Sequence, residues 1–280
     1  MQLNSIDLSF CATIPNIASR TQYNVKMTLK LIEVDTATDF EELIACQWAS
    51  YENPLQPFFR MFCPLNAPTH AESLKESVAL QLRWHNEDPT SYWAKVVNDD
   101  GKIVGGCLWK ICSENPFDTD EDHSYAYWQP EGERREFITQ ALKQFDAPRA
   151  RMGARPQVYV NIVFTHPDHR RQGVANVIMN WSKQKADEMG VELWLDATEQ
   201  GVPVYEKHGF TVVNVNTIQP TKQNPGEEWH KVKEELGPMT FRQMWRPAGG
   251  DYQEGKTVKP WETVEIKYEP ELAYVESHAA

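Results

Sequence analysis

The sequence predicts one mixed α/β domain, and three observations support that prediction. Strand-like and helix-like segments alternate along most of its 280 residues. Residues 158–164 are apolar at nearly every position, which is typical of a central strand buried on both faces of a sheet. An amphipathic helix follows closely, because apolar residues recur at helical spacing from Val174 to Trp181.

A strand, two helices and a two-stranded hairpin are expected in the first part of the chain. Residues 28–34 alternate enough to form a first strand. Apolar residues at helical spacing follow Thr38, a suitable N-cap, and a second helical pattern follows Thr69. Residues 92–97 and 103–111 flank an Asn-Asp-Asp-Gly turn and predict a β-hairpin.

The second part of the chain continues this alternation. A helix is expected over residues 137–145, ending before a loop that contains Pro148. From Arg170 the chain is expected to be helical as far as Gly190, a residue type that commonly ends helices. The remaining elements are expected as a strand at 191–195, a short helix at 202–208, a strand at 210–215, a polar insertion at 219–237 and a strand at 239–245.

Composition limits the class of protein. The formal net charge of −12 argues against a nucleic-acid binder, because phosphates require a basic face. No run of about eighteen apolar residues occurs, so no membrane span is expected. The five cysteines are scattered and form no CxxC pair, which favours reduced thiols over disulfides or a zinc site. We therefore expect a cytoplasmic protein without a metal.

A phosphate-binding pattern joins the central strand to the amphipathic helix. Residues 170–175 read Arg-Arg-Gln-Gly-Val-Ala. The first amides of a helix have no intrahelical partner, and with the helix dipole they attract a pyrophosphate. Gly173 lets phosphates approach the main chain, and the small Ala175 keeps the next turn clear. A glycine at a helix start is more often structural, so this pattern needs a second feature.

Tyr205, on the expected short helix, supplies that second feature. A phenol has an ordinary pKa of about 10, so it stays protonated at neutral pH and is able to protonate a leaving thiolate. A lone helical tyrosine is more often a core residue. In this chain the buried strand, the phosphate loop and the tyrosine helix follow one another along the sequence. Their occurrence together is stronger evidence for a site than any one of them alone.

The stretch from Val158 to Phe210 resembles the GNAT superfamily of N-acetyltransferases. The family motif is Arg or Gln, two residues, Gly, one residue, then Gly or Ala, and Arg170, Gly173 and Ala175 match it. The resemblance also covers His166, Pro167, Asp168, Ala197, Tyr205, Lys207, Gly209 and Phe210. It implies the GNAT fold, an α/β (mixed α+β) architecture whose central mixed sheet is splayed at the fourth strand, with helices on both faces.

The resemblance also sets the expected domain limits. We expect a GNAT domain over residues 27–246, with insertions at about 113–150 and 218–238. Residues 1–26 are expected to be a disordered extension or an artefact of start-codon choice. Residues 247–280 are expected to be an acidic, extended tail.

The resemblance implies acetyl-CoA as co-substrate and an amine as acceptor. The expected cofactor-binding residues are Val163, Phe164, Thr165, Arg170, Arg171, Gln172, Gly173, Val174 and Ala175. The amine attacks the thioester directly, and Tyr205 protonates the departing CoA thiolate. Neither a metal nor a cysteine nucleophile is implied.

The general base is left open. Histone-type family members carry a glutamate on the central strand where this chain has Tyr159. Asp196, Glu199 and His166 are the nearby candidates for a base or an acceptor site, although each is also explained as a loop or capping residue. Alternatively, the proton leaves through water, or the amine arrives neutral.

Three functions remain to be separated. The preferred one is acetylation of a primary amine of a small molecule. Residues 114–133 hold seven carboxylates and four aromatics, which predicts either a lid over a cationic acceptor or a solvated surface loop. The alternatives are a protein acetyltransferase acting on lysines or N-termini and a catalytically silent acyl-CoA-binding module. Tyr205 argues against the silent module, and Tyr159 argues against the lysine enzyme.

Overall fold

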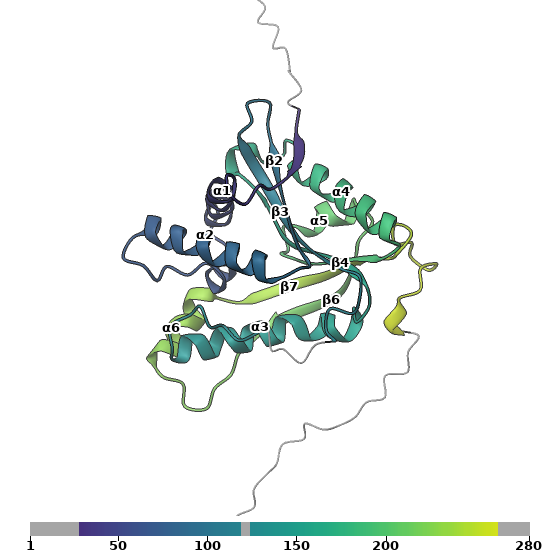
Figure 1. Cartoon of the computed structure of the whole chain (residues 1–280). Coiled ribbons are helices and arrows are strands. Elements are labelled where there is room, and N and C mark those ends of the chain that lie inside the picture. Colours follow the sequence, from purple (N-terminus) through teal and green to yellow (C-terminus); the bar gives the residue numbers. More distant parts are fainter. Residues whose placement is uncertain (1–27, 119–123, 263–280) are drawn as a thin grey trace, which may run out of the picture.

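The computed structural model describes residues 28–118 and 124–262, which form a mixed α/β fold around a seven-stranded sheet (Figure 1). The strand order is β1-β2-β3-β4-β5-β7-β6, and β4 and β5 pair in parallel whereas the other described pairs are antiparallel. The strands are β1 Lys30–Glu33, β2 Ser91–Val97, β3 Ile103–Cys112, β4 Gln157–Thr165, β5 Glu192–Ala197, β6 Thr211–Ile218 and β7 Met239–Arg246. The predicted fold class is confirmed.

Helices cover both faces of the sheet. Those in the described ranges are α1 Phe40–Glu52, α2 His70–Glu87, α3 Glu133–Met152, α4 Val174–Met189, α5 Val202–Glu206 and α6 Glu227–Leu236. α1 and α2 lie on one side of β2–β4, and α4 and α5 lie on the other (Figure 1). The N-cap of α1 is Asp39 rather than the expected Thr38, and α2 begins with a capping box between Thr69 and Glu72.

The sheet opens between β4 and β5, as the fold class predicts. The two strands pair only over residues 157–159 and 192–194, and they separate beyond that point. A bulge in β4 accompanies the separation, because the β3 partners skip Asn161. We call the gap between residues 161–165 of β4 and 195–197 of β5 the β4–β5 opening. It lies at the carboxyl ends of both strands.

The two inserted segments form a layer of their own. α3 lies in the first insertion and α6 in the second, and they pack together over β6 and β7 (Figure 1). The rings of Phe137 and Trp229 meet at 4.9 Å, and Arg134 pairs with Glu235 at 2.7 Å. The same cluster buries Met61, from the 3-10 turn Pro57–Met61 that follows α1. The insertions are therefore part of the packed body of the protein.

Pro148 does not end the helix before β4, contrary to our expectation of a loop. α3 continues through it to Met152. Proline has no N–H to donate to the carbonyl of Gln144, four residues earlier. Asn216 of β6 replaces that donor, since its Nδ2 donates to the carbonyls of Gln144 at 3.0 Å and of Phe145 at 3.1 Å.

One further helix start is wrong, and one helix was not predicted. α4 begins at Val174 rather than at Arg170, because Gly173 has a left-handed φ of 99° that no helix contains. The insertion at 219–237 holds α6, whose three buried apolar residues lie at helical spacing among acidic residues and lysines. The polar composition concealed that spacing.

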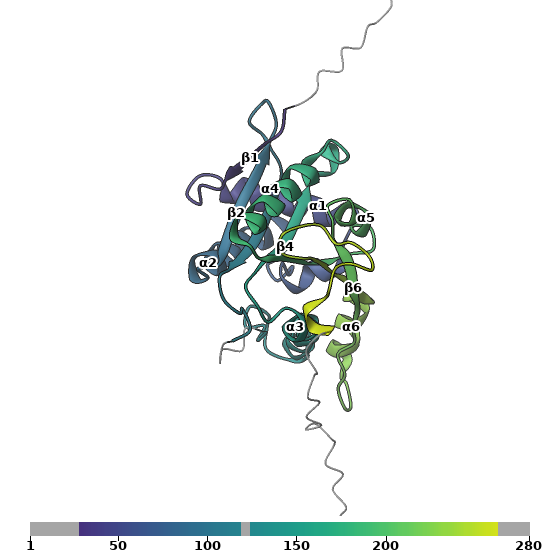
Figure 2. The same cartoon turned by 90° about the vertical axis from the view of Figure 1, so that its right-hand side faces the viewer.

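Residues 247–262 turn back onto the sheet (yellow in Figure 2). The ring of Trp261 packs on those of Trp194 and Trp245, at 5.3 and 5.0 Å. The amide of Tyr252 donates to the carbonyl of Gly209 at 3.0 Å, which ties this segment to the end of α5. The expected extension at 1–26 and the end of the expected tail, after residue 262, lie outside the described residues.

Candidate active site

The loop between β4 and α4 presents backbone amides without partners. Arg171 and Gly173 adopt left-handed conformations, with φ of 60° and 99°. Gly173 is the N-cap of α4 and offers no side chain to cap it. No described group accepts a hydrogen bond from the amides of residues 171–175. These amides, at the positive end of a helix of 16 residues, fit a pyrophosphate.

Gly105 of β3 explains how α4 comes so close to the sheet. A Cβ there would lie 2.6 Å from Cγ1 of Val174 and 2.6 Å from the carbonyl oxygen of Phe164. Glycine therefore lets the first turn of α4 rest on β3, and the buried Val174 fixes the direction of the loop amides. A Gly-Gly pair inside a strand signals such a close approach, and our sequence prediction did not use it.

The side chains of this loop are less available than its amides. Arg170 donates from Nη2 to the carbonyl of Ser50 at 2.9 Å, at the end of α1. Gln172 donates from Nε2 to the carbonyl of Asp168 at 3.1 Å. Arg171 is exposed. Of the predicted cofactor-binding side chains, Arg170 thus joins the loop to α1, and Arg171 is directed to solvent.

The main chain of β4 faces β3 and the β4–β5 opening in alternation. The amide of His166 donates to the carbonyl of Val104 on β3 at 2.9 Å. Backbone groups of successive strand residues point to opposite sides, so those of Phe164 face β3, whereas those of Val163 and Thr165 face the opening. The side chain of Phe164 is buried beneath α1. The structure therefore presents two of the three predicted strand residues to the opening.

Tyr205 approaches the same region from α5. Its ring is half-buried in the core beneath α4 and meets the ring of Phe210 edge-on at 6.1 Å. Burial raises the pKa of its hydroxyl, and the nearby Cys107 thiol raises it further. No described group forms a hydrogen bond with this hydroxyl. The phenol therefore keeps its proton at neutral pH and has it free to donate.

An acidic group lies beside the opening, on the face opposite α4. The hydroxyl of Tyr159 donates to Oδ2 of Asp196 at 3.0 Å, and the Arg149 guanidinium lies 3.5 Å from the centre of the Tyr159 ring. Oδ1 of Asp196 is buried and accepts no hydrogen bond of ordinary geometry from the described residues. Burial raises the pKa of Asp196, and Arg149 and the side chain of Gln243, opposite Asp196 on β7, oppose that rise. A carboxylate whose pKa is raised and whose second oxygen lacks an ordinary hydrogen bond is suited to accept a proton.

The other two base candidates have partners of their own. Nδ1 of His166 accepts a hydrogen bond from the amide of Asp168 at 3.3 Å and caps the turn after β4. Glu199 is exposed and pairs with Arg242 at 2.5 Å. Of the four predicted residues, Tyr159 and Asp196 are therefore hydrogen-bonded to each other. His166 caps a turn and Glu199 forms an ion pair at the surface. Arg149 was not among the predicted site residues, because it lay in the loop expected around Pro148.

The aromatic residues of segment 114–133 also have protein partners. Guanidinium carbons lie 5.4 to 5.7 Å from three of its ring centres. These pairs are Phe117 with Arg149, Tyr125 with Arg135 and Tyr127 with Arg83. Three of the rings that would attract a cationic acceptor in the lid alternative therefore hold the protein's own arginines. Asp120, Glu121 and Asp122 of the expected lid lie outside the described residues.

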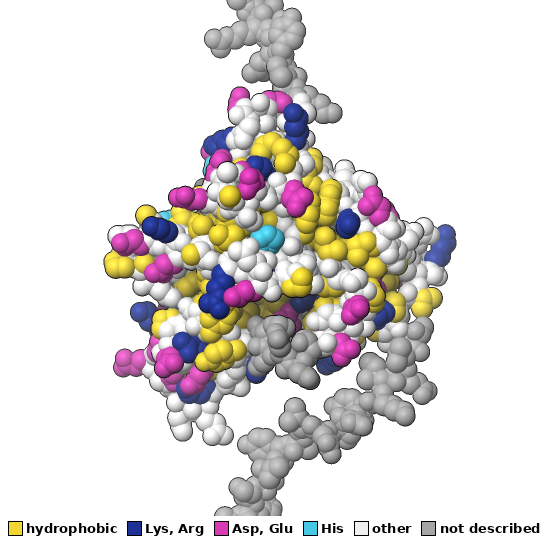
Figure 3. All heavy atoms as spheres, viewed as in Figure 1, with side chains coloured by type: hydrophobic (Ala, Val, Ile, Leu, Met, Phe, Trp, Pro, Cys, Tyr) yellow, Lys and Arg dark blue, Asp and Glu magenta, His cyan; other side chains and the backbone are white. Residues whose placement is uncertain are grey.

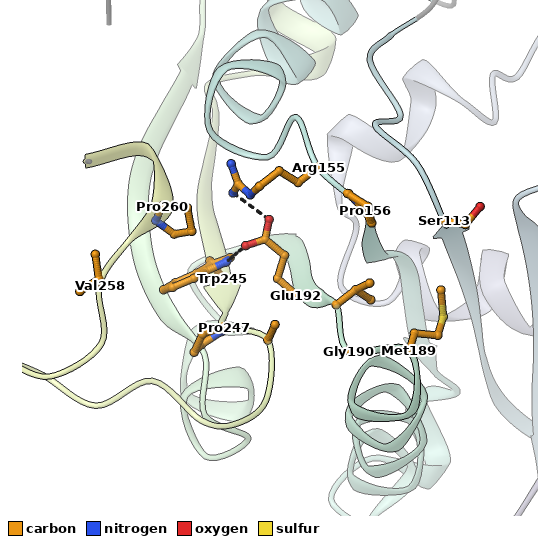
Figure 4. Close-up of a pocket in the computed structure, with 12 residues that line it drawn as sticks. Ser113, Arg155, Pro156, Met189, Gly190, Glu192, Trp245, Pro247, Val258 and Pro260 are labelled. Atoms are coloured by element: carbon orange, nitrogen blue, oxygen red, sulfur yellow. Dashed lines mark hydrogen bonds and ion pairs between the residues drawn. The ribbon is translucent and has the colours of Figure 1, made fainter. Parts of the chain in front are cut away.

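A cavity of about 750 Å³ lies at the other end of β5, away from Asp196 (Figure 4). It is lined by the end of α4, the start of β5 and parts of residues 247–260. Its carboxylate, Glu192, accepts hydrogen bonds from Arg155 at 2.7 Å and from Nε1 of Trp245 at 2.6 Å. Both carboxylate oxygens are therefore satisfied, and this cavity offers no free acid or base.

Three further kinds of site involve the surface and the helices: a basic surface, a membrane span and a metal site. On the face in Figure 3, lysines and arginines are scattered among acidic residues and form no continuous basic surface. No helix in the described ranges is long and apolar enough to cross a membrane. Within the same ranges, no three His, Cys, Asp or Glu side chains gather as a metal site.

The sequence matches the acetyltransferase (GNAT) family over residues 55–210. The chain belongs to this family. It is therefore an N-acetyltransferase, of a family that takes acetyl-CoA as its donor. No curated protein matches the sequence.

Solved structures of N-acetyltransferases share the fold. An agmatine N-acetyltransferase mutant has a TM-score of 0.54 and 12% identity, covering 78% of this chain and 99% of that chain. Arylalkylamine N-acetyltransferase 2 from Aedes aegypti has a TM-score of 0.54 and 14% identity, covering 79% and 99%. The polyamine N-acetyltransferase of Drosophila melanogaster has a TM-score of 0.52 and 13% identity, covering 79% and 100%. Because these sequence identities are low, the similarity shows a shared fold and does not identify the acceptor.

Proposed function

We propose that this enzyme acetylates a primary amine of a small molecule by direct attack of the amine on acetyl-CoA. The position of Asp196 is the main support for this proposal. Its carboxyl group lies beside the β4–β5 opening, and only one of its two oxygens forms a hydrogen bond of ordinary geometry, so it suits a cationic acceptor. The net charge of −12 also favours cationic substrates over anionic ones. Three structures of the same fold are named for small amines, which agrees with this acceptor class.

The loop after β4 and the main chain of β4 are the proposed binding site for acetyl-CoA. The amides of residues 171–175 hold the pyrophosphate, and the backbone groups of Val163 and Thr165 pair with the pantetheine arm. The unpartnered amides support the first contact, and the alternation of β4 supports the second. Acetyl-CoA supplies the acetyl group, already activated as a thioester.

Asp196 and Tyr205 divide the proton transfers in this proposal. Asp196 takes a proton from the ammonium group, so that a neutral amine attacks the thioester carbonyl. The new C–N bond forms as the C–S bond breaks, and Tyr205 gives its proton to the thiolate. The second proton lost by the nitrogen returns to the Tyr205 phenolate through water. Tyr159 holds Asp196 in place by the hydrogen bond at 3.0 Å.

A small acceptor is favoured over a peptide by two features. Tyr159 occupies the position of the histone-type glutamate, and its hydroxyl is committed to Asp196. The layer of α3 and α6 packs over β6 and β7 and against the turn after α1. We propose that this layer narrows the space for an acceptor, which favours a small molecule.

We also propose that residues 27–246 form the GNAT domain. The enzyme is proposed to be cytoplasmic, since its four described cysteines are buried and free.

An acceptor screen tests the proposal. Wild-type enzyme is incubated with acetyl-CoA and with polyamines, amino acids, aminoglycosides, aryl amines or histone peptides. Thiol release and product mass are then measured. Acetylation of a small cationic amine is the expected result. Acetylation of peptides alone contradicts the small-molecule assignment, and binding of acetyl-CoA without thiol release under every condition contradicts catalysis.

A further inference from the structure

Tyr51 of α1 places a hydroxyl in the β4–β5 opening, although sequence reasoning assigned this residue no role in the site. Its oxygen lies 3.2 Å from the carbonyl oxygen of Val163, a residue 112 positions away in the chain. The ring stacks on Phe59 at 4.9 Å with an interplanar angle of 12°, and it meets Phe58 edge-on at 5.8 Å. This packing fixes the direction of the hydroxyl.

The direction of this hydrogen bond follows from the sheet. The carbonyl of Val163 faces the opening, where β5 has already separated from β4 and supplies no donor. A carbonyl has no proton, so the Tyr51 hydroxyl donates and Val163 accepts. Tyr51 thus satisfies a carbonyl that the splay leaves without a strand partner.

Tyr51 and Tyr205 approach the opening from opposite sides of the sheet, because α1 and α5 cover opposite faces (Figure 1). Burial raises the pKa of Tyr51, and the nearby Tyr205 raises it further. Both phenols therefore stay protonated at neutral pH. They differ in what their protons do, since that of Tyr51 is committed to Val163 and that of Tyr205 has no acceptor among the described residues.

A hydroxyl that has donated its proton still has lone pairs, and it then serves only as an acceptor. The reacting end of acetyl-CoA carries a carbonyl oxygen and a sulfur, neither of which has a proton to donate. An attacking amine does carry N–H groups. The committed hydroxyl of Tyr51 is therefore complementary to the acceptor nitrogen and not to the thioester.

We propose that Tyr51 positions the attacking amine, with its oxygen accepting a hydrogen bond from the acceptor N–H while its own proton remains on the Val163 carbonyl. This inference rests on the proposed function, because it requires an amine acceptor in the opening. It adds a contact on the acceptor side, opposite the proton donor Tyr205. Asp196 then removes the proton, and Tyr51 sets the direction of the lone pair that attacks.

Tyr51→Phe tests this role, because it removes the hydroxyl and keeps the ring packed on Phe59. We expect kcat/KM for the acceptor to fall about tenfold or more, as for loss of one hydrogen bond to a polar or charged group. Acetyl-CoA affinity by calorimetry and acceptor-independent thiol release are expected to stay within about twofold of wild type. Tyr92→Phe is the matched control, since that hydroxyl contacts Glu33 at 3.3 Å at the far edge of the sheet.

Two results would overturn the inference. One is unchanged acceptor kinetics in Tyr51→Phe. The other is a parallel loss of acetyl-CoA affinity, which would mean that the hydroxyl only shapes β4. Failure of the proposed function gives a different result, because the wild-type enzyme then acetylates peptides alone. In that case Tyr51→Phe is compared with wild type and Tyr92→Phe on the acetylated peptide. A wild type that acetylates no amine overturns both.

Discussion

Tyr159 and Asp196 bridge β4 and β5 at the point where these strands part. Tyr159 is the last residue of β4 in register with β5, opposite Trp194, and Asp196 lies two residues further along β5. The hydrogen bond of 3.0 Å between them fixes one carboxylate oxygen and leaves Oδ1 without a hydrogen bond of ordinary geometry from the described residues. An orientated carboxyl group therefore lies beside the opening in which we propose that acceptor and donor both bind.

The first prediction concerns the proton acceptor. Asp196→Asn keeps the shape of the side chain and an oxygen for Tyr159 but removes the basic carboxylate. We expect kcat/KM for the acceptor to fall about a hundredfold, the usual range for loss of general base catalysis. Acetyl-CoA affinity should be unchanged by calorimetry. Glu199→Gln is the control, because Glu199 is exposed and paired with Arg242. Equal losses in the two variants would refute a specific role for Asp196.

The same substitution predicts a change in how stability depends on pH. Burial raises the pKa of Asp196 in the folded state above that of an unfolded carboxyl, which is about 3.9. Between these values the native state binds the extra proton, so the free energy of unfolding falls as pH rises and the loss is complete above the folded pKa. Asp196→Asn lacks this term. Urea unfolding from about pH 4 to pH 8 should show the variant gaining stability relative to wild type as pH rises.

A constant difference across that range would contradict the raised pKa. A difference that grows in the opposite direction would mean that the ionised carboxylate is stabilised in the native state, as it would be if Arg149 outweighed burial. Glu199→Gln serves again as the reference, since its carboxylate is at the surface.

Tyr205→Phe tests the proton donor. The hydroxyl has no partner among the described residues, so its removal leaves no buried group unsatisfied and should not alter stability. We expect kcat to fall about a hundredfold, with acetyl-CoA affinity unchanged. Because burial raises the pKa of Tyr205, wild-type kcat should show no alkaline decline near the ordinary tyrosine pKa of about 10. A fully active variant would exclude Tyr205 from the mechanism.

Gly173→Glu tests the phosphate site. A carboxylate at the start of α4 would compete with a bound pyrophosphate for the same amides and repel it, and two like charges about 4 Å apart near a protein surface cost about 4 kcal/mol. We expect acetyl-CoA to bind at least about tenfold more weakly by calorimetry. Gly190→Glu is the matched control, because Gly190 also has a left-handed φ, of 66°, and caps the other end of the same helix. Equal affinity in both variants would disprove the assignment.

Local spacing explains which parts of this structure were predictable. The phosphate loop and the tyrosine helix depend on neighbouring residues, so the motif at 170–175 and Tyr205 stand out in the sequence. Tyr51 does not, because its role depends on a contact across 112 residues and on the orientation of one carbonyl. Arg149 was equally hidden, since its contact with Tyr159 requires a helix that continues through Pro148.

The position of Pro148 supplies the last prediction. Asn216 is buried and donates to the carbonyl of Gln144, which the proline leaves without a helical donor, and to the neighbouring carbonyl of Phe145. Asn216→Ala should lower the free energy of unfolding by about 1–3 kcal/mol, the cost of buried unsatisfied groups. Thr217→Ala, at the exposed neighbouring position, is the control. Pro148→Ala returns an N–H to the helix, so Asn216→Ala should cost less in that background. A double-mutant cycle by urea unfolding measures this coupling, and strictly additive effects would show that Asn216 does not replace the missing donor.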